Sequence, residues 1–523
     1  MSEYDNISRR AGIFGFFTLI SRILGLIRDS VVAYFFGTKA VADAFYVAFR
    51  IPNLLRRLLA EGSLTMAFVP VFTEYLKQSR EEGKKVADIV FTYLSILLAL
   101  ITVLGVIFAP WIVKVIAYGF GGSSDKFALT VYLTRIMFPY IFLVSLMAFA
   151  MGVLNTLKIF GAPAASPILL NLGIIAGASV FSRWSAEPTA GLAMGVVIGG
   201  VMQLVMQIPW LKKEGMIPRL NFNWRHPALK RVGLIMLPSI YGGAVYQINV
   251  MVITLLASFL PHGSVSYLWY ADRVNEFPLG LFAVAVATAS LPTLSDHAAD
   301  NNHQAFKDTL NYSLRIAWTE SIPAMVGIWL LAEPIVRVLF QRGQFQTDST
   351  IGTVDALQFF ALGIPFITGV RNIVPAYYTM RDAKTPVKAA TITLIVNIVC
   401  SLILMKPMLH KGLAFSMTIA SAVNFFVLIY IFRRRQGVIG GRKLVSSIVK
   451  TSIASLGIIA VVSIAKYNFG FFTNIERWTE IYQLFSVIII SVIIYLFLLR
   501  LIAPEEFGHF KSVIFRKATK LAR

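Results

Sequence analysis

Long apolar runs alternate with short polar connections along this chain. Each run holds about 20 residues or more, enough for a helix to cross a hydrocarbon core of about 30 Å. The second run is interrupted by polar residues. The pattern predicts an all-α polytopic membrane protein with about fourteen transmembrane helices, at residues 11–37, 41–76, 86–117, 127–157, 164–182, 189–211, 232–260, 264–295, 310–340, 351–380, 386–405, 412–432, 444–465 and 481–502.

Charged residues interrupt the first of these runs at helical spacing. Ser21, Arg22, Gly25, Arg28 and Asp29 lie within roughly a third of a helix circumference. A charge at the bilayer centre costs about 2.5 to 3.5 kcal/mol even on insertion scales, so such residues usually face a protein interior or a wet cavity. One face of this helix is therefore predicted to line a substrate path.

A second polar face follows in the run at 41–76. Its members are Asp43, Tyr46, Arg50, Asn53, Arg57 and Glu61. They span about 80° of arc in a continuous helix, although Pro52 is expected to kink it. Arg56, Arg57 and Glu61 are equally compatible with a cytoplasmic helix end that reaches lipid headgroups.

The eighth run contains a third charged group. Asp272, Arg273 and Glu276 can share one helical face. We expect them in the same cavity, and a self-neutralising structural cluster is the alternative. Arg371 in the tenth run is either a cavity group or a tie between helices.

The recurrence of arginine favours an anionic substrate. A guanidinium stays charged at any working pH and binds phosphate or carboxylate through two parallel hydrogen bonds. A proton-driven drug exporter would more naturally rely on carboxylates that titrate within the membrane. Since the arginines are as prominent as the carboxylates, the cavity is predicted to select an anion.

Composition and charge agree with this class of protein. Hydrophobic residues make up 57% of the chain, charged residues 14%, and mean hydropathy is +0.71. The net charge of +22 is concentrated in segments predicted to be cytoplasmic, which is the positive-inside pattern. We therefore predict that both termini are cytoplasmic, that anionic membrane lipid rather than nucleic acid is the partner, and that no signal peptide is cleaved.

Catalytic and cofactor signatures are lacking in the sequence. It has no zinc-protease motif, nucleophile elbow or phosphate loop, so we expect no enzyme, no metal and no cofactor. The single cysteine, Cys400, lies in an apolar run and is expected to serve packing.

An internal repeat organises the predicted helices. A shift of 222 residues places Pro70 on Pro292, and a shift of 226 places Pro139 on Pro365. Chance register between apolar helices is the alternative. The repeat predicts two parallel six-helix lobes, at 1–225 and 226–435, with substrate bound between them, and an appended pair of helices with a basic tail at 436–523.

Several motifs together resemble the MurJ (MviN) lipid II flippases. They are SRILGLIRD at 21–29, ADAF at 42–45, PNLLRR at 52–57, AEG at 60–62, YADRVNEFP at 270–278 and KTPVK at 384–388. The resemblance extends to about residue 435, and these motifs in combination are specific to the family.

The resemblance implies both a fold and a function. The fold is that of the multidrug/oligosaccharidyl-lipid/polysaccharide exporters, and the function is to move lipid II, an undecaprenyl-pyrophosphate-linked peptidoglycan precursor, to the outer leaflet of the bacterial inner membrane by alternating access. By motif, Arg22, Arg28, Asp43, Arg57 and Arg273 take the places of the family's essential cavity charges. The lipid tail is placed beside the last two helices, and cell-wall synthesis proteins are candidate partners.

The chain departs from the family in one respect. Some members hold sodium with a carboxylate from the seventh, eleventh or twelfth helix, where this chain offers Asn249, Asn397 and Asn424. Sodium coupling is therefore not predicted, and coupling to the membrane potential or to protons stays open.

Two other functions are compatible with parts of the sequence. An exporter of drugs or of another polyprenyl-linked sugar shares the fold, and only the motifs and the arginines favour lipid II over it. A membrane enzyme acting on polyprenyl phosphate would change the lipid covalently, whereas a flippase changes only its leaflet.

Overall fold

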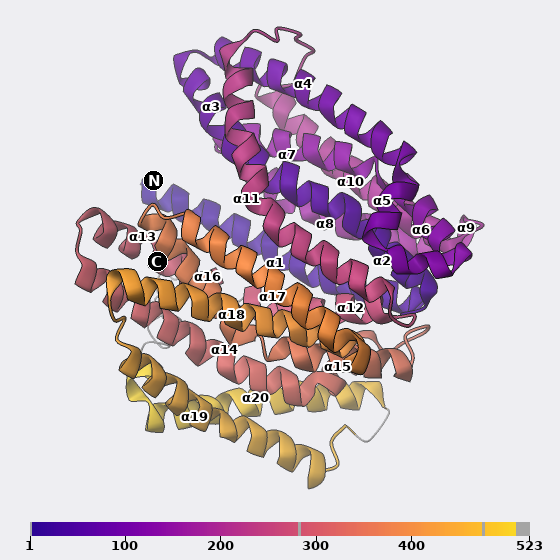
Figure 1. Ribbon diagram of the computed structural model, residues 1–523. Helices are drawn as coiled ribbons and strands as arrows, with labels where there is room; N and C mark the ends of the chain where they lie inside the picture. Colours follow the sequence, from indigo (N-terminus) through magenta and orange to yellow (C-terminus); the bar gives the residue numbers. More distant parts are fainter. Residues whose placement is uncertain (1–2, 281–283, 473–475, 509–523) are drawn as a thin grey trace. The chain divides into compact units, whose positions relative to one another are not determined.

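The computed structural model describes residues 3–280, 284–472 and 476–508 (Figure 1). These residues form helices joined by short turns, without strands. Nine described helices are long and apolar enough to cross a membrane, and a bent pair of helices makes a tenth candidate span. The all-α polytopic membrane fold is thus confirmed, while the number fourteen stays a prediction.

The chain divides into two compact units. Unit 1 comprises residues 1–266 and 342–346. Its helices are α1 (Glu3–Phe36), α2 (Ala40–Leu55), the π-helix η1 (Arg56–Leu64), α3 (Thr65–Gln78), α4 (Arg80–Ile107), α5 (Ala109–Ile116), the short 3₁₀ turn η2 (Tyr118–Gly122), α6 (Ser124–Met137), α7 (Tyr140–Thr156), α8 (Gly161–Ala176), the π-helix η3 (Gly177–Phe181), α9 (Ser182–Trp184), α10 (Pro188–Lys213) and α11 (Pro227–Ser258).

Unit 2 comprises residues 267–341 and 347–523. Its helices are α12 (Ser264–Pro278), whose first turn still belongs to unit 1, α13 (Val284–Ala299), α14 (His303–Phe340), α15 (Thr347–Ala361), α16 (Ile364–Thr379), α17 (Lys384–Met408), α18 (His410–Gln436), α19 (Gly441–Tyr467) and α20 (Arg477–Ile502). Helix α11 packs with unit 1. The lobes predicted at 1–225 and 226–435 are defined by the sequence repeat instead of by packing, and their boundary stays a prediction.

Prolines explain why several predicted spans consist of two helices. The run at 127–157 breaks between α6 and α7 at Pro139, and the run at 351–380 breaks before Pro365, where α15 and α16 meet at a bend of 46°. Proline removes a backbone donor and clashes with the preceding turn. In the second run Pro52 lies inside α2, one turn before the helix passes into η1 at Arg56.

Glycines allow α8 and α10 to pack closely. A Cβ on Gly173 would lie 2.6 Å from the Cα of Gly199, and a Cβ on Gly195 would lie 2.5 Å from the carbonyl oxygen of Gly173. Only glycine tolerates such an approach, and helix pairs in membranes commonly use small residues in this way. Because α8 also packs against α1, this contact helps to position the first polar helix.

The last two helices pack against α14 within unit 2 (Figure 1). Arg315 of α14 binds Glu506, which follows α20, with an Nη2–Oε1 distance of 2.5 Å. Nearer the other end of α14, Arg337 binds Glu480 at 3.1 Å, and the Tyr495 hydroxyl donates to the carbonyl oxygen of Thr319 at 2.6 Å. These contacts fix the appended pair to the rest of the unit.

Candidate functional site

Arg28 and Asp29 on α1 form a buried ion pair. The guanidinium of Arg28 is 2.7 Å from Oδ1 and 2.9 Å from Oδ2 of Asp29. Its other terminal nitrogen donates to Oδ1 of Asn171 on α8 at 3.1 Å, and the Asn171 amide donates to the carbonyl oxygen of Ser21 at 3.0 Å. The two helices are thus tied by a polar network that occupies both charges.

Arg22 lies one to two turns earlier on α1 in a different setting. Its side chain is exposed, and it makes no hydrogen bond or ion pair with any described residue. Because an unpaired guanidinium on an apolar helix needs water or an anion beside it, Arg22 has the properties expected of a group that binds a mobile anion.

Asp43, near the start of α2, is almost completely buried and accepts four hydrogen bonds. Its Oδ1 accepts from the backbone N–H and the hydroxyl of Ser266, at 2.9 and 2.7 Å. Its Oδ2 accepts from the N–H of Gly263 at 2.8 Å and from Nζ of Lys126 at 2.9 Å. In this conformation Asp43 fastens α2 to α6 and to the start of α12.

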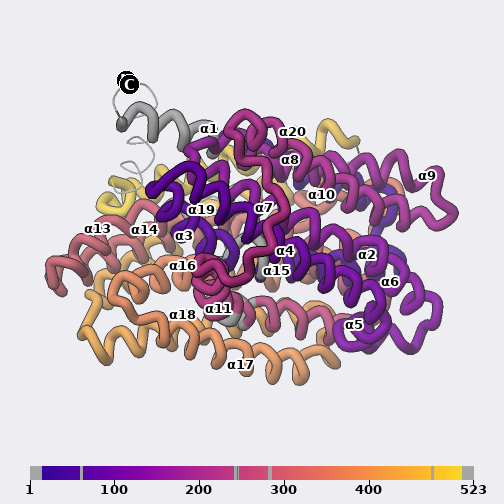
Figure 2. The backbone as a smooth tube through the Cα atoms, turned by 90° about the horizontal axis from the view of Figure 1, so that it is seen from above, coloured from indigo at the N-terminus to yellow at the C-terminus, as the bar shows by residue number. Residues whose placement is uncertain are grey.

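Lys126 is a residue that the sequence analysis did not single out. It is buried in the first turn of α6, lies 3.9 Å from the centre of the Phe120 ring and places Nζ 3.2 Å from Nδ1 of His262. Figure 2 shows α2, α5 and α6 together at one end of unit 1. The sequence does place a single lysine at the start of an apolar run. Such lysines usually extend to the lipid headgroups, so the burial of Lys126 was not expected.

Arg50 and Asn53, further along α2, both contact other side chains. Arg50 donates to the hydroxyl of Thr254 on α11, and Asn53 accepts from Nε of Arg56 at 2.9 Å. Arg50 therefore ties α2 to α11, and Asn53 supports the start of η1. The side chain of Glu61, which was predicted on the same face, lies outside the described residues.

Arg57 stands in η1 directly after Arg56 and is half-buried. It makes no hydrogen bond or ion pair with any described residue. The π-helix that carries it packs against α7 and α11. π-Helical segments are rare and occur frequently at functional sites, which makes Arg57 the second candidate for anion binding in unit 1.

In unit 2 the three predicted charges lie on α12. Arg273 donates to Oε2 of Glu276 at 3.1 Å, and its guanidinium lies 4.9 Å from the centre of the Trp269 ring. The side chains of Asp272, Arg273 and Glu276 are all partly exposed. This guanidinium thus lies against a ring face and donates to one carboxylate oxygen.

Arg371 on α16 donates to the carbonyl oxygen of Leu279, just beyond α12, at 3.2 Å. It therefore ties α16 to the end of the helix that carries Arg273. No group of three or more histidine, cysteine or carboxylate side chains able to hold a metal ion occurs among the residues the structure describes.

The structure thus sorts the predicted residues into two groups. Arg28, Asp29, Asp43, Arg50 and Asn53 bind other parts of unit 1. Arg22 and Arg57 in unit 1, and Arg273 beside Asp272 and Glu276 in unit 2, form the second group, whose side chains are exposed or half-buried. Asn171 on α8, for which no role was predicted from the sequence, accepts from Arg28 of the buried pair.

Comparison with known proteins identifies relatives across the chain. The family model described as lipid II flippase MurJ matches residues 32–493. The lipid II flippase MurJ of Burkholderia cenocepacia is 38% identical over 424 residues, which is 80% of this chain and 82% of that protein. A probable lipid II flippase MurJ of Buchnera aphidicola is 35% identical over 499 residues, covering 94% and 97%.

Solved structures give the same result for the fold. A lipid II flippase MurJ in an inward closed conformation superposes with a TM-score of 0.78 and 28% identity, over 97% of this chain and 99% of that one. An inward-facing multidrug transporter of the MATE family superposes with a TM-score of 0.69 over 82% of this chain and 99% of that one. Its identity of 14% supports likeness of fold alone.

Proposed function

Because the chain belongs to the lipid II flippase MurJ family, we propose that it moves lipid II from the cytoplasmic to the outer leaflet of the bacterial inner membrane. The observation that carries the proposal is the family match over residues 32–493, which spans both units. Relatives that bear the same name are similar over 80% and 94% of the chain. The transport is by alternating access, with the headgroup taken up in one state and released in another.

The pyrophosphate of the substrate is assigned to the arginines that have capacity to bind it. Arg22 and Arg57 make no contact with a charged or polar partner among the described residues. Arg273 lies against the ring of Trp269, donates to Glu276 and is half-buried. A pyrophosphate carries several acceptor oxygens and at least two charges, so it matches a set of forked guanidinium donors.

The buried charges have a different role in this proposal. Arg28, Asp29 and Asp43 position α1 and α2 through the contacts described above. A direct contact of these three residues with the substrate stays a prediction, because it requires the release of partners that they already hold. Breaking a buried ion pair by removing one partner costs about 3 to 5 kcal/mol, so such a release would have to be driven by substrate.

Both termini are proposed to be cytoplasmic, from the distribution of lysine and arginine. Single cysteines at exposed positions on the two kinds of loop, in a background that lacks Cys400, test this orientation. An impermeant thiol reagent added to whole cells should label the cysteine at Gly121 and not the one at Lys213. The reverse pattern would invert the topology.

The function is tested by complementation of a strain depleted of its lipid II flippase, together with a leaflet-specific assay for lipid II. The wild-type chain should restore growth and surface lipid II. Failure at full membrane abundance would argue against the assignment. Transport of another polyprenyl-linked sugar without lipid II would favour the related exporters, and a covalently altered lipid would indicate an enzyme.

A further inference from the structure

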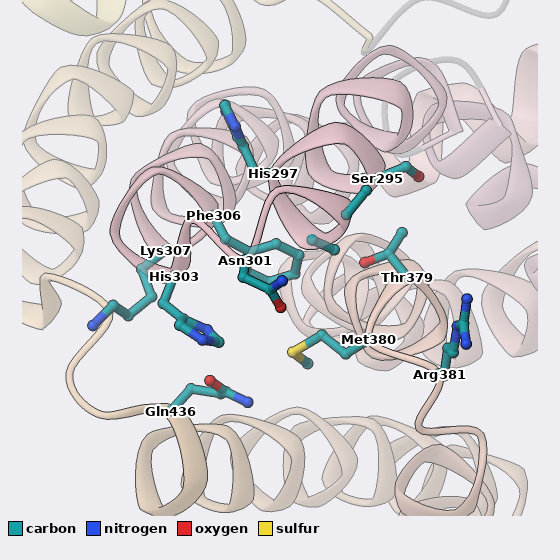
Figure 3. Close-up of a pocket in the computed structure, with 12 residues that line it drawn as sticks. Ser295, His297, Asn301, His303, Phe306, Lys307, Thr379, Met380, Arg381 and Gln436 are labelled. Carbon is teal, nitrogen blue, oxygen red and sulfur yellow. The ribbon is translucent and has the colours of Figure 1, made fainter.

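Unit 2 contains an open cavity of about 590 Å³ that has no part in the proposed transport site. It lies where the C-terminal end of α13 and the N-terminal end of α14 approach the C-terminal ends of α16 and α18 (Figure 3). Phe306 and Met380 contribute apolar walls. Phe306 itself belongs to the buried core of the unit, so the bottom of the cavity rests on packed structure.

The lining of the cavity is basic. It includes Lys307 and Arg381, together with His297 and His303, and none of the described residues that line it is acidic. In Figure 3 Lys307 and Arg381 lie on opposite sides, and His297 points away from the central space. The cavity therefore carries two permanent positive charges at its edges and an imidazole ring, His303, nearer its centre.

The carboxylates next to Lys307 and Arg381 in the chain bind other groups. Asp382, next to Arg381 in the chain, is occupied by Arg435, with an Oδ2–Nη1 distance of 2.7 Å, and by the N–H and hydroxyl of Thr385. Asp308, next to Lys307, accepts from the amide of Gln304 at 3.2 Å. The basic side chains of the cavity make no hydrogen bond or ion pair with any residue in the described part of the chain.

Neutral donors complete the lining. The amides of Asn301 and Gln436 and the ring of His303 point toward the central space in Figure 3. None of these three side chains has a hydrogen-bond partner in the chain as described. Several donors that face one space, with cations at its edges, fit an anion with several acceptor oxygens.

We propose that this cavity binds a phosphate-bearing anion, with the phosphate between His303, Asn301 and Gln436 and the charges of Lys307 and Arg381 on either side. The volume accommodates a phosphate ester rather than a simple ion alone. By the charge distribution this end of unit 2 is on the predicted cytoplasmic side. An anionic phospholipid headgroup and a soluble phosphate ester present the same chemistry, so the experiment separates the two sources.

The test uses the full chain in nanodiscs of phosphatidylcholine. Two probes are compared: phosphatidylglycerol included in the disc and counted by native mass spectrometry, and glycerol 3-phosphate titrated from solution and followed by thermal shift. The variant Lys307→Gln with Arg381→Gln removes both charges of the cavity. The control Lys212→Gln with Lys213→Gln removes the same charge from the exposed end of α10 in unit 1.

We expect one saturable equivalent of one probe on the wild type and on the control, and an affinity at least about tenfold weaker on the cavity variant. Retention of phosphatidylglycerol identifies a lipid headgroup, and saturable stabilisation by glycerol 3-phosphate identifies a soluble ligand. An equal loss of probe affinity in the cavity and control variants would overturn the proposal, as would the absence of saturable binding of either probe to the wild type.

Single variants keep the proposal testable if the double variant does not fold. His303→Leu and Gln436→Leu remove hydrogen-bonding groups from an exposed and a half-buried position, and both leave Lys307 and Arg381 in place. Each should weaken binding of the same probe severalfold while the melting temperature without probe stays near that of the wild type. Unchanged binding in both single variants would contradict the assigned geometry.

Discussion

The ammonium of Lys126 lies 2.9 Å from Oδ2 of Asp43, and both side chains are buried. The pair joins α2 to α6, and the same carboxylate accepts from Gly263, just before α12, and from Ser266 in the first turn of α12. Asp43, which the family resemblance associates with the transport cavity, therefore has a structural role in this conformation, because it joins these helices. The distinction between positioning and substrate contact is open to experiment.

The first prediction concerns this junction. Lys126→Met should lower the free energy of unfolding by about 3 to 5 kcal/mol, because it leaves the Asp43 carboxylate buried without its counter-charge. Adding Asp43→Asn should recover part of the loss, since the amide carries no charge to compensate. Thermal or chemical unfolding in detergent measures both changes.

The matched control for this junction is Lys114→Met, which alters an exposed lysine that lies near the ring of Trp111. It should change stability by no more than about 0.5 kcal/mol. If the losses from Lys126→Met and Asp43→Asn simply added, the two residues would not be coupled and the junction would be misassigned.

Arg56 and Arg57, which are neighbours in η1, are predicted to have different roles. Arg57→Ala should reduce flipping strongly at normal abundance and stability, since its guanidinium has no partner in the described chain and is assigned to the pyrophosphate. Arg56→Ala should instead keep most of the activity while losing about 1 to 3 kcal/mol of stability, because it breaks the hydrogen bond to Asn53. Lipid II transfer and melting temperature are read on the same samples, and the opposite pattern would exchange the two roles.

Arg273 supports a third prediction. Arg273→Ala should lower the flipping rate by roughly 10- to 150-fold, the equivalent of about 1.5 to 3 kcal/mol for a lost contact to a charged group. Arg273→Lys should recover only part of the rate, because an ammonium lacks the planar fork. Glu276→Gln, which removes the ion-pair partner but keeps the side-chain length, serves as the control and should keep transport. Wild-type rates in the alanine variant would remove Arg273 from the substrate site.

Asp382 gives a prediction on pH. Burial alone would raise the pKa of this carboxyl, but the hydrogen bonds from Thr385 and the charge of Arg435 outweigh it and hold the pKa below the ordinary value. The lowered pKa means that Asp382 contributes stability above about pH 4, and that this contribution is lost as pH falls through the folded-state value.

Asp382→Asn should therefore melt below the wild type at pH 7, and the difference should shrink toward pH 3. Melting temperatures of both proteins across this range check the prediction. A difference that is the same at pH 7 and pH 3 would show that the contacts of Asp382 do not depend on its charge.

The sequence predicted the fold better than the roles of individual charges. Apolar runs indicated the spans, because hydrophobic length is a local property. The breaks near Pro139 and Pro365 were not predicted, since both runs were read as single spans. Whether Arg28 is free depends on Asn171, which is 143 residues away in the chain. The burial of Lys126 likewise depends on Asp43 and His262 in distant segments, so helical spacing alone could not separate it from a lysine at the headgroups.

Proteoliposomes that contain the purified chain and lipid II in one leaflet test the central claim most directly. The wild type is expected to transfer chemically unchanged lipid II to the other leaflet. The variant with Arg22→Ala, Arg57→Ala and Arg273→Ala should be reconstituted equally well but transfer it no faster than protein-free vesicles. Transfer by the triple variant at the wild-type rate, or no transfer by the wild type, would contradict the account.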